Sequence, residues 1–236
     1  MTTTVPQKPM MSRRALSARQ SVEGLSLLIG IVALMWIVEV INSLDSYRLD
    51  SDGGLIPRDV DRVWAIFTSP FLHAGWQHLI DNTIPLVFMG VIIALRGAAK
   101  LALVTLIVIV VGGLGTWLIA PAGTSTVGAS GVVFGYAAYL FARGLFDRSA
   151  LEIFTGVVVG VVWGGALLSS VVPHAGISWQ AHVCGAIGGV IAAWLLAGRK
   201  AASRPPGGRG DGDPLGGRGS TPHRPVHDPI DRALAQ

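Results

Sequence analysis

Six stretches of strongly apolar sequence do most to restrict the folds open to this chain. Most of them are roughly 17 to 22 residues long, enough to cross a hydrocarbon core of about 30 Å as a helix. The composition agrees: 14% of the 236 residues are charged and the mean hydropathy is +0.57, too apolar for a soluble domain. The sequence therefore predicts an all-α, polytopic membrane protein with six transmembrane helices. The expected spans are Leu25–Ile41, His78–Leu95, Leu101–Ala120, Ser130–Leu145, Leu151–Val172 and Trp179–Ala197.

The chain divides into three regions by composition. Residues 1–24 are polar and are expected to form a cytoplasmic segment before a retained first span. Residues 25–198 hold the six spans and form the membrane domain. Residues 199–236 are rich in Gly, Pro and Arg with few large apolar side chains, which is typical of a disordered tail.

Lys and Arg between the spans predict the orientation of the bundle. They are concentrated before span one, after spans two and four, and after span six, all of which fall on one side of a six-span protein. The opposite side has three arginines among five aspartates in its first loop, and its other loops carry no charge. Both termini are therefore expected to be cytoplasmic, in a multi-pass protein of a cell membrane, and the bias toward Ala, Gly, Val and Arg suggests a bacterial one. The basic residues on the cytoplasmic side are Lys8, Arg13, Arg14, Arg19, Arg96, Lys100, Arg143, Arg148, Arg199, Lys200 and Arg204.

This orientation brings polar residues from distant segments to similar depth. Spans two, four and six all run from the outer to the inner face, so their first turns share the outer leaflet. Those turns contain His78 and Asn82, then Ser130, then His182. Polar side chains at membrane depth are costly and usually face a bundle interior or a wet cavity. We therefore expect one joint site, open to the extracytoplasmic side.

Glycines favour close contact between the fourth and sixth spans. Gly185 and Gly189 follow His182 along one helix face, and GASG (Gly128–Gly131) places Gly128 and Gly131 around Ser130. Small residues let membrane helices approach closely, and that packing role is the simpler explanation for them. If the two glycine faces do meet, Ser130 comes within reach of His182.

A serine and a histidine in contact suggest nucleophilic catalysis. A positioned imidazole can take the proton of a serine hydroxyl, and Ser130 and His182 are the candidates for these roles. No carboxylate is placed to orient His182, so the prediction is a dyad. His78 and Asn82 lie one turn apart and could stabilise an oxyanion, although either could equally be an interfacial residue, as we expect for Asp81.

The remaining chemistry-bearing residues indicate no cofactor. Cys184 is the single cysteine and cannot form an intrachain disulfide. The sequence has no metal-type Cys/His spacing, P-loop or dinucleotide fingerprint. We expect neither a metal nor a cofactor, and no nucleic-acid partner.

Three motifs together resemble the rhomboid intramembrane serine proteases. They are HLIDN (His78–Asn82), GASG (Gly128–Gly131) and SWQAHVCGAIGG (Ser178–Gly189), similar to the family's HxxxN, GxSG and AHxxG, and the resemblance spans roughly Trp64 to Leu196. It implies a six-helix bundle that cleaves peptide bonds in or near the transmembrane segments of other membrane proteins. By similarity Ser130 is the nucleophile, His182 the general base and acid, and His78 with Asn82 the oxyanion stabilisers.

The resemblance also implies roles at the edges of the site, with two departures. His73 matches a structural residue of the first loop, the loop 173–178 a cap over the site, and the fifth span a side gate. Many bacterial members have Tyr where this chain has Phe134, which keeps the ring for packing, so catalysis should survive. Many also have Trp-Arg in the first loop where this chain has Trp64-Ala65, which leaves the docking of that loop open.

Two other functions are compatible with a polytopic chain. One is a catalytically inactive rhomboid-like protein that binds and routes transmembrane clients, although such relatives generally lack the serine or the histidine, and this chain has both. The other is a small transporter, for which the sequence shows no inverted repeat or broken-helix pair. The sequence identifies neither the substrate nor the oligomeric state.

Overall fold

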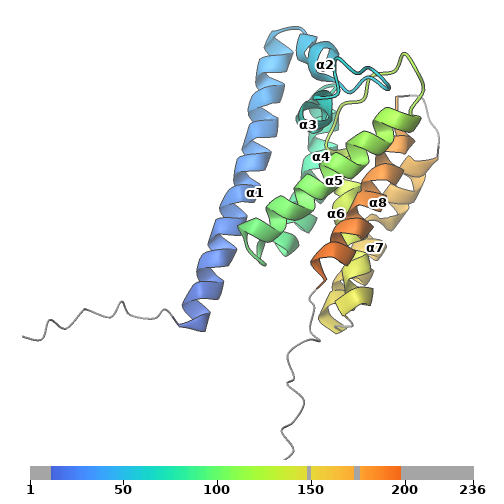
Figure 1. Ribbon diagram of the computed structural model, residues 1–236. Coiled ribbons are helices and arrows are strands. Elements are labelled where there is room, and N and C mark those ends of the chain that lie inside the picture. The colour runs from blue at the N-terminus through green and yellow to red at the C-terminus, as the bar shows by residue number, and fades with distance from the viewer. Residues whose placement is uncertain (1–11, 148–149, 173–175, 198–236) are drawn as a thin grey trace, which may run out of the picture. The chain divides into compact units, whose positions relative to one another are not determined.

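The computed structural model describes residues 12–147, 150–172 and 176–197, and within them the chain is helical (Figure 1). Six long helices match the six predicted spans, which confirms the all-α polytopic fold. The predicted tail, 199–236, lies outside the described residues. The long helices are α1 (Arg13–Leu44), α4 (Trp76–Ala94), α5 (Ala98–Ile119), α6 (Ser130–Asp147), α7 (Ala150–Val171) and α8 (Trp179–Leu196).

The outer surfaces of these helices are apolar, as a lipid-facing protein requires. By length and composition, α1, α4, α5 and α8 can each cross a membrane, and α6 and α7 contain shorter apolar stretches. Large hydrophobic side chains lie exposed along all six helices, whereas soluble monomers rarely expose contiguous apolar surface on this scale. The protein is therefore a multi-pass membrane protein. Examples of these exposed residues are Leu34, Ile84, Leu106, Phe141, Val161 and Trp194.

Helix α1 is longer than the apolar segment that predicts it. It begins at Arg13, with the Ser12 hydroxyl accepting a hydrogen bond from the Ala15 amide. Its 32 residues span about 48 Å, well beyond the hydrocarbon thickness of about 30 Å. The added turns carry polar side chains such as the paired Arg19 and Glu23. Hydropathy alone does not reveal this extension, because a polar helix continues an apolar one without a break.

Helix α6 packs closely against α8 through facing glycines. A Cβ added at Gly185 would lie 2.8 Å from the carbonyl carbon of Gly131 and closer still to its oxygen. One added at Gly189 would meet the carbonyl of Gly135 in the same way. Helix α5 packs on the other side of α8, with Gly112 lying against Gly185. The predicted contact of the two glycine faces is thus present, and at Gly185 and Gly189 a side chain larger than hydrogen would clash with the backbone of α6.

Helix α1 packs on α4 and α5 at the edge of this group (Figure 1). The Trp36 indole donates a hydrogen bond to the Thr83 hydroxyl of α4 at 3.2 Å. Near the other end of α1, the Ser21 hydroxyl donates to the Leu95 carbonyl at 2.9 Å. Such hydrogen bonds help to hold α1 against its neighbours, because the hydrophobic effect contributes little to helix association inside lipid.

The loop between α1 and α4 contains three short helices and docks on the end of α5. These are α2 (Arg48–Gly53), α3 (Ala65–Thr68) and the 3₁₀ helix η1 (Ser69–Phe71). Arg58 donates to the carbonyls of Leu118 and Ala120, at 3.0 and 2.8 Å, and so satisfies groups left open at the end of a helix. The question left open by Trp64-Ala65 is thereby answered: Ala65 is fully buried and the loop docks through other residues.

Candidate active site

Ser130 is the first residue of α6, and the turn before it is held by the docked loop. The Gly128 amide donates to the Ser69 carbonyl at 2.9 Å, and the Ala129 amide donates to Nε2 of His73 at 3.4 Å. Gly128 has φ +115°, which L side chains rarely adopt. A Cβ there would also lie 2.6 Å from Cε1 of the His78 ring. This position therefore requires glycine for both its backbone conformation and its space.

His73 fixes this turn as a neutral imidazole. It is fully buried, and burial lowers its pKa to about 4. Because Nε2 accepts the Ala129 amide proton, the ring proton must lie on Nδ1. The expected structural role of His73 thus becomes specific: it holds the backbone one residue before Ser130.

His182 lies in the first turn of α8 and contacts Ser130 directly. Its Nε2 is 2.9 Å from the Ser130 Oγ, and only 5% of the histidine is exposed. The Phe134 ring, one turn after Ser130, stacks on the imidazole with centroids 4.2 Å apart and planes inclined by 3°. The Ser178 hydroxyl accepts a hydrogen bond from the Ala181 amide at the start of α8. The imidazole is therefore oriented by stacking on one face and by the anchored helix end.

His78 and Asn82 lie on the opposite side of the turn. The Ala74 amide donates to Nδ1 of His78 at 3.3 Å, so a neutral His78 carries its proton on Nε2, the edge that faces Gly128. The Asn82 amide donates to the His78 carbonyl at 2.9 Å, and its nitrogen also lies near Gly128. The structure thus brings all four polar residues singled out from the sequence together around residues 128–130.

A cavity of about 630 Å³ joins these side chains. Its wall includes His78, Asn82, Ser130 and His182, together with Trp163 from α7. Trp163 also packs on Phe88 of α4, with ring centroids 6.4 Å apart. The cavity therefore lies where α4 and α7 border α6 and α8. Residues 173–175 of the predicted cap lie outside the described residues.

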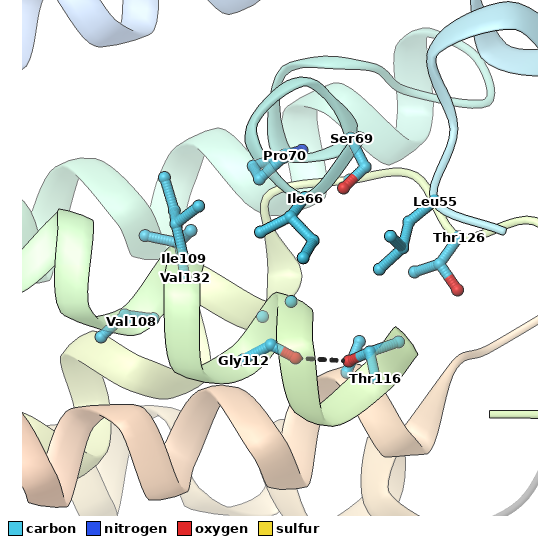
Figure 2. Close-up of a pocket in the computed structure, with 14 residues that line it drawn as sticks. Leu55, Ile66, Ser69, Pro70, Val108, Ile109, Gly112, Thr116, Thr126 and Val132 are labelled. Carbon is cyan, nitrogen blue, oxygen red and sulfur yellow. Dashed lines mark hydrogen bonds between the residues drawn. The ribbon is translucent and has the colours of Figure 1, made fainter. Parts of the chain in front are cut away.

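A separate pocket of about 40 Å³ borders the same turn (Figure 2). Gly128 and Gly131 line it from the site, and Ile66 and Ser69 from the docked loop. Helix α5 closes it with Gly112 and Thr116, whose hydroxyl donates to the Gly112 carbonyl at 2.7 Å, as the dashed line in Figure 2 shows. A volume of this size can accommodate water. The glycines that shape the turn therefore leave free space beside it.

Two features of the site were not predicted from sequence. Asp81, expected to be an interfacial residue, is exposed and also lines the cavity with the candidate dyad. The available signal was its place on the same helix as His78 and Asn82, directly before Asn82. The Ser69 carbonyl, which holds the Gly128 amide, has no sequence signal because it is a main-chain contact. Within the described parts of the chain, no cluster of three or more His, Cys, Asp or Glu could hold a metal ion.

The structure thus places a serine and a histidine in contact at the starts of two apolar helices of a multi-pass membrane protein, with Ser130 half-buried and His182 buried. Comparison with known proteins identifies its family: the model of the Rhomboid domain matches residues 60–199. The chain belongs to the rhomboid family.

Relatives from several organisms agree with this assignment. An uncharacterized protein of Mycobacterium tuberculosis is 42% identical over 183 residues, which cover 74% of this chain and 76% of that protein. An uncharacterized protein of Mycobacterium leprae is 45% identical over 175 residues, 70% of this chain and 68% of its own. A Bacillus subtilis protein named as a candidate rhomboid protease is 30% identical over 139 residues, 58% of this chain and 69% of its own.

Proposed function

We propose that the protein is an intramembrane serine endopeptidase that hydrolyses peptide bonds in or near the transmembrane segments of other membrane proteins. The observation that carries the proposal is the 2.9 Å separation between Ser130 Oγ and His182 Nε2. That distance is within the range in which a general base takes a hydroxyl proton. Membership of the rhomboid family supports the same reaction class.

In this proposal His182 removes the Ser130 proton as the oxygen attacks the substrate carbonyl, and then returns it to the leaving amine. The attack places negative charge on the carbonyl oxygen, which needs donors fixed in advance. His78 Nε2–H, the Asn82 amide and the Ser130 backbone N–H are the candidates for this role. The Ser130 amide is one of the N–H groups at a helix start that have no intrahelical partner.

Access follows from the same geometry. A substrate helix would reach the cavity between α4 and α7, where Phe88 and Trp163 meet, with part of its chain unwound beside Ser130. Water would enter from the extracytoplasmic side, and both termini of the protein would be cytoplasmic, as the loop charges predict.

The test is cleavage of a reporter substrate in proteoliposomes. The reporter has one transmembrane segment, small residues near its outer end and a fluorophore on each side. Wild type is expected to cleave it, and Ser130→Ala and His182→Ala are each expected to lose at least about a thousandfold in rate, as removal of a nucleophile or base typically does.

The matched control is Ser43→Ala, which removes a hydroxyl that donates to the Val40 carbonyl within α1 and lies outside the cavity lining. Cleavage that persists in Ser130→Ala would overturn the proposal. Stable binding of the reporter by wild type without any cleavage would instead favour an inactive rhomboid-like protein that routes clients.

A further inference from the structure

The wall of the active-site cavity carries one carboxylate, from Asp81. Among the described residues that line the cavity, it is the single Asp or Glu, and Lys and Arg are absent from the lining. Asp81 is exposed and shares this cavity with Ser130 and His182, so a substrate side chain bound there would come near its carboxylate. The mechanism proposed above gives it no task.

The same turn of α4 contains Pro85, four residues after Asp81. Pro85 is buried and lines the cavity as well. Gln77 donates to one carboxylate oxygen of Asp81 at 2.8 Å, which holds the side chain along the helix. A carboxylate held in this way favours a hydrogen-bond donor that carries positive charge.

We propose that Asp81 is a specificity-determining residue, which favours substrates with a Lys or Arg side chain near the scissile bond. The inference rests on the proposed protease function and names a preference within its substrate class. Asp81 is exposed at this wall, so water partly screens its charge, and the carboxylate acts on a substrate side chain only at short range. A cationic substrate side chain gains this attraction in the bound state, and an anionic one is repelled.

This preference would restrict the protease to a small share of the transmembrane proteins in the membrane. Lys and Arg are uncommon in the outer flanks of transmembrane segments, because they favour the cytoplasmic side. A protease with an acidic cavity wall would therefore act on the minority of segments with a basic residue next to the outer cleavage position.

The test uses the full-length protein in neutral-lipid vesicles and a set of matched reporter substrates. Each reporter carries Lys, Gln or Glu at one position within six residues of the scissile bond, and kcat/KM is compared within each enzyme variant. Wild type is expected to prefer Lys over Gln by about three- to tenfold at one or two positions, an effect in the range of a single partly shielded ion pair. Glu is expected to be the poorest residue there.

Two variants assign the preference to Asp81. In Asp81→Asn the ratio of Lys to Gln substrates should fall to about one, and in Asp81→Lys the Glu substrate should become the best of the three. The matched control is Asp61→Asn, which neutralises an exposed loop carboxylate outside the cavity lining and should keep the wild-type ratio. Added salt should reduce the wild-type preference, because it screens charge.

Equal kcat/KM for all three residues in wild type, or an unchanged Lys preference in Asp81→Asn, would overturn this inference while leaving the protease function intact. A parallel measurement separates it from failure of catalysis. Ser130→Ala with a photo-crosslinker in the reporters should capture the Lys reporter in preference to the Glu reporter, whether or not the wild type cleaves. Equal capture of the two reporters would refute the role of Asp81.

Discussion

Replacing Gly185 with alanine tests the helix contact on which the site depends. The new Cβ would lie 2.8 Å from the carbonyl carbon of Gly131 and 3.0 Å from its Cα, whereas ordinary contacts begin near 3.4 Å. Both groups are backbone, so neither can rotate away, and α8 must shift from α6 by roughly 1 Å. Because His182 precedes Gly185 on one side of this contact and Ser130 precedes Gly131 on the other, their 2.9 Å hydrogen bond should lengthen beyond reach.

The expected result of Gly185→Ala is a large loss of activity with a moderate loss of stability. Misplacing catalytic groups by about 1 Å can lower the rate about a hundredfold. Overpacking of this kind typically costs about 1–3 kcal/mol in the free energy of unfolding. The assay is the rate of reporter cleavage in proteoliposomes, normalised to the fraction of folded protein measured by thermal unfolding in detergent.

The control for this variant is Gly30→Ala in α1. It makes the same chemical change inside a helix, but nothing lies within 4 Å of the added Cβ. It should keep the wild-type rate and gain up to about 1 kcal/mol from helix propensity. Wild-type cleavage by folded Gly185→Ala would refute the argument that the glycine contact aligns the dyad.

Three further substitutions test single contacts in the site. Asn82→Ala should lower kcat by roughly a hundredfold with little change in KM, since one oxyanion donor is typically worth about 2.7–4 kcal/mol and others remain. An unchanged kcat in reporter cleavage would show that Asn82 is not an oxyanion donor. Phe134→Ala should lower kcat by about tenfold, because the imidazole loses the ring stacked 4.2 Å from it, while Phe134→Tyr should keep most of the rate. Burial lowers the pKa of His73 to about 4, so the unfolded chain binds more protons than the folded protein between that pH and about 6.5. The free energy of unfolding should therefore decrease by about 2 kcal/mol from pH 7 to pH 5. His73→Asn should remove this part of the pH dependence in thermal unfolding, and an unchanged slope would contradict the assignment.

The predictable parts of this structure are those that local sequence patterns determine. The six helices follow from apolar length, because a bilayer accepts few other structures. The contact of α6 with α8 follows from Gly185 and Gly189, since small residues one and two turns after His182 mark the face that a neighbour can approach. The meeting of Ser130 and His182 could therefore be predicted before any coordinates, although their chemical roles stay predictions.

The unpredicted parts depend on contacts between distant segments. Arg58 adopts φ +62° and bonds to carbonyls sixty residues away, a docking that no local pattern indicates. The hydrogen bond from the Ala129 amide to His73 is of the same kind. The place of Asp81 in the cavity wall was not predicted, because it depends on how α4 is rotated against α6, although its exposure is compatible with the interfacial role expected from sequence.

The most direct test of the central claim is labelling of the purified protein by a fluorophosphonate probe, which reacts with activated serines. Mass spectrometry should locate the label on Ser130 in wild type, and labelling should be abolished in Ser130→Ala and reduced to background in folded His182→Ala. Labelling of His182→Ala at the wild-type rate, or a label on a different serine, would contradict the account that His182 activates Ser130.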